Sequence, residues 1–282
     1  MFRIIERKEL NPGTVKMTVE APRVAAKAKP GQFVIIRADE FGERIPLTIA
    51  ASDKENGGVT VIFQTVGAST MKIAAKKEGE YLSDLVGPLG RASELDGYKK
   101  VAVVGGGLGC AIAYPQAKYL ASVGTEVDLI AGFRTKDLII LEDEMKACGN
   151  LVVVTDDGSN GNKGLVTDAL RRLIEEGADY DLVIAIGPPI MMKFVCLLTK
   201  EYGIKTVVSM NPIMIDGTGM CGGCRVSVGG ETKFACVDGP DFDGHEVDFD
   251  LLMRRNNGYR AEETAAREKT CNLFKTEGRT DA

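Results

Sequence analysis

The sequence predicts an antiparallel β-barrel or sandwich, then a doubly wound parallel α/β sheet, then a short glycine- and cysteine-rich segment. Short β-rich runs separated by Pro and Gly fill residues 1–97, which is typical of antiparallel sheets. Apolar strands alternate with helical stretches over residues 98–209, which indicates a parallel sheet. Residues 210–282 carry three closely spaced cysteines and end in a polar tail. We therefore expect two folded modules and a C-terminal appendage.

The first module is expected to contain strands near residues 33–36, 47–49 and 59–63. Turn-forming sequences separate its apolar runs, namely Asn11-Pro12-Gly13, Lys29-Pro30-Gly31 and Asn56-Gly57-Gly58. The second module is expected to have buried strands at 100–104, 127–131, 151–155 and 182–186. Helical stretches lie between these strands, at 110–123, 142–147 and 165–176.

Composition narrows the function classes. The net charge of −5 opposes nucleic-acid binding, because phosphate recognition needs a cluster of excess cations. The N-terminus lacks the apolar core of a signal peptide, and no later segment reaches the ~18–20 apolar residues that span a bilayer. We therefore expect a cytoplasmic protein without a membrane segment. Its 7 cysteines then favour thiol chemistry or metal ligation over disulfides.

A glycine run follows the first strand of the second module. Gly105, Gly107 and Gly109 stand where a strand ends and a helix begins, a position at which backbone amides hold a pyrophosphate. The spacing departs from G-x-G-x-x-G, so a plain packing turn is the alternative. Gly187 and Pro188 follow another predicted strand and either frame the same crevice or simply end the strand.

Two further motifs lie in the first module. In Arg44-Ile45-Pro46-Leu47-Thr48, alternation along a strand predicts that Arg44, Pro46 and Thr48 share one face. An arginine suits a diphosphate and a hydroxyl suits a ring nitrogen, although a surface arginine on an edge strand is the simpler interpretation. Gly67, Ser69 and Thr70 precede a helical stretch, as an N-cap or as a second phosphate site.

The cysteine-rich segment carries the strongest signal. Plant-type [2Fe-2S] sites use C-x4-C-x2-C and a distant fourth cysteine. Here Asp216, Cys221, Cys224 and Cys236 fit that frame if the aspartate takes the first position. A Cys3Asp zinc site and unliganded thiols are the alternatives. The single histidine, His245, lies in an acidic loop and is interpreted as a hydrogen-bonded loop residue.

With these motifs the chain resembles the ferredoxin reductase-like electron-transfer subunits. These include the dihydroorotate dehydrogenase electron-transfer subunit and the small subunit of NADH-dependent reduced ferredoxin:NADP+ oxidoreductase, also known as a sulfide dehydrogenase subunit. The resemblance spans nearly the whole chain and rests on residues 211–224 and on Phe234-Ala235-Cys236-Val237-Asp238-Gly239-Pro240. The dihydroorotate-type subunits have cysteine where this chain has Asp216, so they match less well.

The resemblance implies an FAD-binding β-barrel over residues 1–97, an NAD(P)-binding α/β domain over 98–209 and a [2Fe-2S] segment with a C-terminal tail over 210–282. It places Arg44, Pro46, Leu47, Thr48, Gly67, Ser69 and Thr70 on FAD. It places Gly105, Gly107 and Gly109 on NAD(H), and Asp216, Cys221, Cys224 and Cys236 on the cluster. No side chain has a catalytic role. Arg134 follows the second strand of this domain, where it would meet a 2′-phosphate, so NAD is favoured by the resemblance and not by the residues.

The resemblance also implies a partner. The related small subunits form a heterodimer with a larger flavin and iron–sulfur subunit, the pair performs electron bifurcation, and ferredoxin is reached through the partner. Two alternatives remain, a dihydroorotate dehydrogenase electron-transfer subunit and a non-catalytic interaction module stabilised by zinc.

Overall fold

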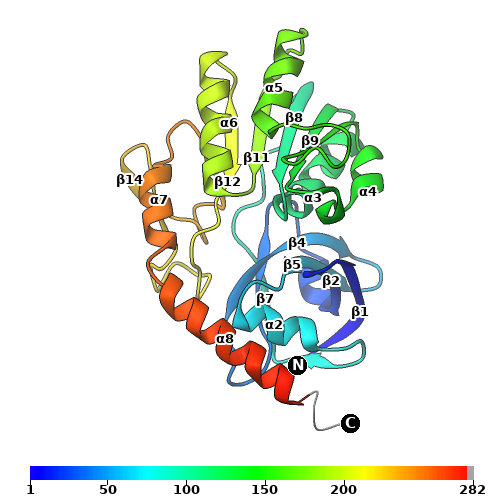
Figure 1. Ribbon diagram of the computed structural model, residues 1–282, viewed down its shortest axis with the longest axis vertical. Coiled ribbons are helices and arrows are strands. Elements are labelled where there is room, and N and C mark those ends of the chain that lie inside the picture. The colour runs from blue at the N-terminus through cyan, green and yellow to red at the C-terminus, as the bar shows by residue number, and fades with distance from the viewer. Residues whose placement is uncertain (278–282) are drawn as a thin grey trace.

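The computed structural model describes residues 1–277, with side chains through residue 270, and places the barrel below the α/β sheet in Figure 1. The barrel sheet runs in the order β6-β1-β2-β5-β4-β3-β7, with antiparallel pairing throughout. Its elements are β1 (Phe2–Asn11), β2 (Thr14–Glu20), α1 (Pro22–Ala25), β3 (Phe33–Arg37), β4 (Ile45–Asp53), β5 (Gly58–Gln64), α2 (Ala68–Ala75), β6 (Tyr81–Leu82) and β7 (Asp84–Leu89).

The second sheet has the order β10-β9-β8-β11-β12-β15. Its strands are parallel except β15, and the order reverses between β8 and β11, where doubly wound sheets open a crevice at the strands' carboxyl ends. The elements are β8 (Lys100–Gly106), α3 (Gly109–Ser122), β9 (Glu126–Phe133), the 3-10 turn η1 (Lys136–Leu138), α4 (Glu142–Lys146), β10 (Asn150–Thr155), α5 (Val166–Glu175), β11 (Leu182–Ile186), α6 (Pro189–Glu201), β12 (Thr206–Ser209) and β15 (Asp241–Asp243). Together the two sheets confirm the predicted fold class.

The C-terminal part joins both modules. It contains the hairpin β13 (Arg225–Val228) and β14 (Glu231–Phe234), followed by α7 (Phe249–Asn256) and α8 (Arg260–Glu277). Strand β15 pairs with β12, so the second sheet takes its edge strand from this part. Figure 1 shows α8 running from α7 along the barrel to α2. The domain boundaries at 97/98 and 209/210 stay a prediction.

The buried core shows how closely the cysteine-bearing part is attached. Phe33 and Ile35 of the barrel share one apolar cluster with Cys224 and Cys236 and with the strand residues of the α/β sheet. A second cluster covers the other face of that sheet, around α3, and a third fills the barrel. Within the described residues, no helix is long and apolar enough to span a membrane.

Candidate functional site

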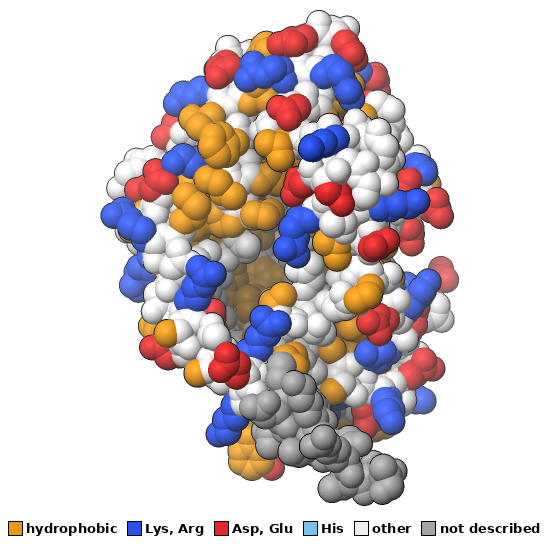
Figure 2. All heavy atoms as spheres, in the orientation of Figure 1, with side chains coloured by type: hydrophobic (Ala, Val, Ile, Leu, Met, Phe, Trp, Pro, Cys, Tyr) orange, Lys and Arg blue, Asp and Glu red, His pale blue; other side chains and the backbone are white. Residues whose placement is uncertain are grey.

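A cavity of about 1010 Å³ lies between the barrel and the point where the order of the parallel strands reverses. It opens as a hollow on the face in Figure 2, with hydrophobic side chains gathered beside it. Exposed Ile190 and Phe194 of α6 belong to that apolar rim. The volume is at the upper end of the usual range for ligand pockets, about 300–1,000 Å³, and suits a large, extended ligand.

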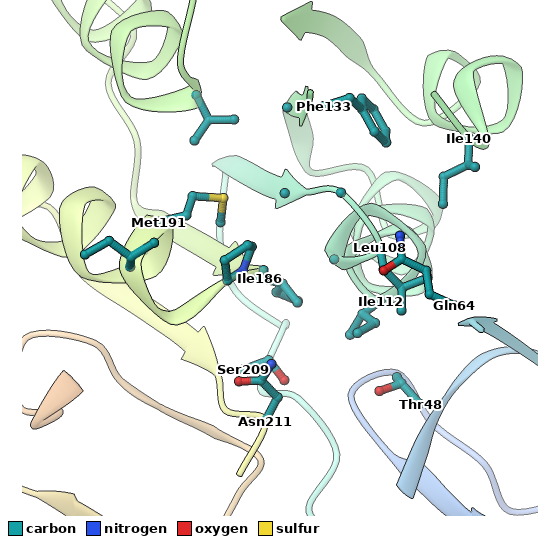
Figure 3. A pocket seen from close by; sticks show the side chains of 18 of the residues that line it. Thr48, Gln64, Leu108, Ile112, Phe133, Ile140, Ile186, Met191, Ser209 and Asn211 are labelled. Carbon is teal, nitrogen blue, oxygen red and sulfur yellow. The ribbon is translucent and has the colours of Figure 1, made fainter. Parts of the chain in front are cut away.

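Strand β4 forms the barrel side of the cavity. Pro46, Leu47 and Thr48 all line it, and Figure 3 shows Thr48 across from Ser209 and Asn211. Arg44, which immediately precedes β4, does not line it, and three consecutive residues of β4 do, so the alternation predicted from the sequence does not decide which side chains face the cavity. The Arg44 guanidinium instead donates hydrogen bonds to two carbonyls far along the chain, as described below.

The predicted second phosphate site lies at the start of α2, outside the cavity. There the Gly67 amide donates to Thr70 Oγ1 at 3.0 Å, and the Thr70 hydroxyl donates to the Gly67 carbonyl at 2.9 Å. Ser69 Oγ donates to Glu43 Oε2 at 2.7 Å. These bonds form a helix cap, and a phosphate reaching Ser69 would have to displace the Glu43 carboxylate. A phosphate role for Gly67, Ser69 and Thr70 stays a prediction.

The glycines of the turn between β8 and α3 have different roles, some in packing and some in leaving space for a ligand. A Cβ on Gly105 would meet Cys110 Cα at 2.9 Å, and one on Gly109 would meet the Ile186 carbonyl at 2.1 Å. Gly107 has φ +56° and lines the cavity, and a Cβ added to it would have no neighbouring atom within 4 Å. Gly105 is therefore a packing residue, Gly109 packs and lines the cavity at once, and Gly107 leaves room for a ligand to approach the backbone.

The end of β11 and the start of α6 lie against the glycine turn and form the next part of the cavity wall. Gly187 and Pro188 both line the cavity, as the strand-end position predicted. They also end β11 and begin α6, so both predicted roles of this motif are compatible with the structure.

Two opposite charges stand at the far rim. Arg134 follows β9 and Asp156 follows β10, and both line the cavity. Arg134 was expected from the sequence and Asp156 was missed, although its place at the end of a parallel strand is the same signal. A carboxylate there suits a ribose hydroxyl and a guanidinium suits a phosphate, so this rim bears on the choice between NAD and NADP.

The predicted ligands lie as two pairs. Cys221 Sγ donates to Asp216 Oδ1 at 3.4 Å, and Cys224 Sγ donates to Cys236 Sγ at 3.2 Å. Two ligands of one tetrahedral metal with bonds of ~2.0–2.3 Å are about 3.3–3.8 Å apart. Each pair thus has nearly the spacing of two ligands on one iron. Across residues 1–277, no group of three or more possible ligands has formed.

Asp216 is held by the loop in which it lies, residues 211–224, which we call the ligand loop. Its Oδ2 accepts from the amides of Met220 and Cys221, each at 3.0 Å. Desolvation opposes its ionisation, but hydrogen bonds from Thr218 and Cys221 outweigh that effect and lower the pKa of Asp216 to about 2. The side chain is therefore a carboxylate at neutral pH, which is the form that binds metals.

The second pair is buried. Burial, and then the hydrogen bond and charge of Cys224, raise the pKa of Cys236 to about 12. The Cys236 thiol is thus protonated in the metal-free protein, and iron has to displace its proton. Three sulfur donors and one carboxylate, in pairs of suitable spacing, fit a two-iron cluster better than a single zinc ion, which needs all four donors around one centre.

His245 and the acidic region around it lie elsewhere. The His245 amide donates to Asp243 Oδ1 at 2.9 Å, and its Nε2 shares a hydrogen bond with Thr199 Oγ1 at 3.0 Å. These contacts match the interpretation of a hydrogen-bonded loop histidine.

Comparisons with known proteins agree with this layout. Residues 211–248 match the iron–sulfur cluster binding domain of dihydroorotate dehydrogenase B, and residues 103–197 match an oxidoreductase NAD-binding domain. The chain is 55% identical over 275 residues to an uncharacterized protein in the adh 3′ region of Clostridium beijerinckii, covering 94% of this chain and 93% of that one.

Two further relatives carry functional descriptions. A Thermotoga maritima homologue of the dihydroorotate dehydrogenase B (NAD+) electron-transfer subunit is 46% identical over 278 residues, covering 99% of this chain and 97% of that one. A solved structure of the NADH-dependent reduced ferredoxin–NADP oxidoreductase, described for its flavin-based electron bifurcation, is 45% identical with a TM-score of 0.91. The match covers 95% of this chain and 97% of that chain.

Proposed function

This chain belongs to the family of dihydroorotate dehydrogenase B electron-transfer subunits and their homologues, and from that premise we propose that it is the small subunit of an electron-bifurcating NADH-dependent ferredoxin:NADP+ oxidoreductase. In that role it moves electrons between NAD(H), FAD and a [2Fe-2S] cluster. The chain is an oxidoreductase subunit with an NAD-binding and an iron–sulfur domain. One observation carries the proposal: the cavity is bounded by β4, by the glycine turn and by residues 209–212. The last two of these residues are the start of the ligand loop, so the cavity and the predicted cluster site adjoin along the chain.

Residues that line the cavity support this proposal. Pro46, Leu47 and Thr48 would hold the flavin ring, while Gly107, Gly109 and Gly187 would face the nicotinamide dinucleotide with Pro188 and Arg134. Arg44, which precedes β4 and lies outside the cavity lining, would bind the FAD diphosphate. A bound flavin supplies the conversion of a two-electron hydride into one-electron steps. The protein would bind and orient the flavin and the nicotinamide dinucleotide and keep water out of the cavity. We assign no catalytic acid or base.

The two ligand pairs assign the cluster. Asp216 and Cys221 would hold one iron, and Cys224 and Cys236 the other. The ligand loop lies at the surface with Met220 and Cys221 exposed, so the cluster has a route to a partner. We propose that the partner is a larger flavin and iron–sulfur subunit in a cytoplasmic heterodimer, and that ferredoxin is reached through it. A dihydroorotate dehydrogenase electron-transfer subunit is the second candidate, favoured by the family match over residues 211–248.

Purification under anaerobic conditions with any co-purifying subunit tests the proposal. The protein should carry flavin and iron, and NADH should bleach the flavin. Arg44→Ala should lower flavin retention on dialysis, because it removes a charge-assisted contact worth about 1.5–3 kcal/mol. A colourless protein would favour the zinc-stabilised module, and a lone 30.2 kDa chain with full ferredoxin-linked activity would refute the heterodimer.

A further inference from the structure

Two arginines of the barrel reach the two ends of the predicted cluster site. Arg44 Nε donates to the Ile215 carbonyl at 3.1 Å, and Arg44 Nη2 donates to the Asp216 carbonyl at 3.4 Å. Arg91, just after β7, donates from Nε to the Val237 carbonyl at 3.2 Å. Asp216 is the first predicted ligand and Val237 follows the last, Cys236. The guanidinium groups therefore hold the backbone at both ends of the ligand set.

Apolar contacts between these two points seat the ligand loop on the barrel. Gly217 has φ +77°, and a Cβ there would meet Leu89 Cδ1 at 2.7 Å and Ile35 Cγ1 at 3.1 Å. On the other side, a Cβ on Gly90 would meet the Gly239 carbonyl at 3.1 Å, and the Arg91 amide donates to that carbonyl at 2.7 Å. Gly217 of the ligand loop thus packs directly on barrel side chains, and Gly239, three residues after Cys236, meets the barrel backbone.

Outside the barrel, Met214 and Cys224 anchor the ligand loop in the apolar core, and Arg255 Nη2 of α7 donates to the Gly223 carbonyl at 3.4 Å. Residues 211–224 contain turns and bends but no helix or strand. The hydrogen bonds of Asp216 tie the loop to itself, so they fix its shape and not its position. Between these anchors, contacts of Ile215, Asp216 and Gly217 with the barrel hold the part of the loop that carries the first predicted ligand.

From these contacts we propose that Arg44 and Arg91 form a clasp that positions the iron–sulfur ligands against the flavin barrel. The inference rests on the proposed function for its purpose, since electron transfer between flavin and cluster falls steeply with their separation. Arg44 also links the two sites. A guanidinium has five N–H donors, and two of its nitrogens are used here, so a diphosphate contact and the clasp are compatible.

The clasp is tested by hydrogen–deuterium exchange on the full chain as purified. Arg91→Met and Arg44→Met remove the donors and keep an unbranched side chain of similar length. Exchange should rise about three- to fivefold in the peptide covering residues 211–224 for Arg44→Met and in the peptide covering residues 234–240 for Arg91→Met, which corresponds to one net hydrogen bond. Arg23→Met on α1 is the matched control, because Arg23 is an exposed barrel arginine, and it should leave these peptides unchanged.

A second readout is the rate at which a ferrous chelator removes iron from the reduced protein. Each clasp variant should lose iron about three- to fivefold faster than the wild type, and the double variant should show about the product of the two effects, since the contacts lie at separate ends. Hydrogen–deuterium exchange in peptides from β8 to β11 reports whether a variant is folded. If Arg91→Met is not folded, Arg91→Gln serves as a milder substitution.

If the Arg44 and Arg91 variants were folded and their hydrogen–deuterium exchange at both ends of the ligand set equalled that of the wild type, the clasp would be overturned. That result is distinct from failure of the proposed function, because exchange needs neither flavin nor NADH. Bleaching of the wild-type flavin by NADH, measured on the same preparation, tests the proposed function separately.

Discussion

The cavity and the ligand loop are built in different ways. The cavity walls are the ends of regular elements, such as Pro46 in β4 and Gly107 between β8 and α3, and hydrogen bonds within the sheets fix them. The ligand loop has no regular elements, and the four predicted donors, three in this loop and Cys236 after β14, lie as two separate pairs. The nucleotide side is thus formed in advance by the fold, whereas the cluster side needs iron to join its pairs.

This difference predicts that the two sites fail independently. Loss of iron should loosen the ligand loop and leave the cavity intact, and damage at the glycine turn should spare the cluster. The variants below test that independence, from the largest expected effect to the smallest.

Cys236→Ser should give the largest effect, nearly complete loss of iron with flavin retained. Cys236 is 1% exposed and pairs with Cys224, so a hydroxyl leaves one iron without its buried thiolate. Iron and flavin contents of the purified protein measure the outcome. Cys148→Ser, at another buried thiol outside the ligand loop, is the control and should keep its iron. Loss of flavin together with iron in Cys236→Ser would contradict independent sites.

Gly107→Val should slow reduction of the flavin by NADH at least about tenfold, which corresponds to roughly 1.4 kcal/mol, and leave iron and flavin contents unchanged. The side chain would fill the space where a pyrophosphate approaches, and φ +56° adds backbone strain. Gly124→Val carries similar strain, with φ +86° and open space around it, in the turn before β9. Equal NADH reduction rates in both variants would remove Gly107 from the nucleotide site.

Asp216→Cys should change the cluster's spectrum without removing it. A thiolate donates more charge to iron than a carboxylate does, so the EPR g-values and the reduction potential should move while iron content stays the same. Asp216→Ala, which offers no ligand, should lose cluster. If both variants kept the wild-type EPR spectrum, the fourth ligand would lie elsewhere.

Asp241→Asn should have the smallest effect, on stability alone. Burial raises the pKa of Asp241, and hydrogen bonds from Ser93 and Ser209 only partly oppose this. The folded protein then holds a proton that the unfolded chain has already lost, so stability falls as pH rises from the ordinary pKa of 3.8 to the folded value.

The Asp241→Asn side chain does not titrate, so the variant does not lose this stability as pH rises. Its melting temperature relative to the wild type should therefore be higher at pH 7 than at pH 5, with exposed Asp137→Asn as the control. The same difference at both pH values would show that Asp241 does not titrate in this range.

Much of the fold follows from the sequence because local patterns decide it. The predicted strand 182–186 coincides with β11, and the expected helix 110–123 lies one residue from α3 (Gly109–Ser122). The C-terminal part was less predictable. Helix α8 occupies the region from about residue 256 that was expected to be a polar tail, and α7 lies just before it. Strand β15 joins a parallel sheet from the other direction, which its short acidic sequence does not indicate.

The functional residues likewise divide into those that local sequence patterns predict and those that depend on tertiary contacts. Alternation along a strand led to Pro46, and strand-end positions led to Gly107 and Gly187. The contacts of Arg44 with residues 171 and 172 positions away depend on tertiary structure. Asp241 is a similar case, since its burial beside Ser93 and Gln116 arises only when all three parts of the chain meet. Local pattern carries no information about such contacts.

An anaerobic titration of the wild-type protein with NADH, followed by visible absorbance and by EPR, tests the central claim most directly. We predict that the flavin bleaches and that the EPR signal of a reduced [2Fe-2S] cluster then appears. In Cys236→Ser the bleaching should persist without that signal. A protein that carries flavin and iron but passes no electron from NADH to the cluster would contradict the proposed electron path.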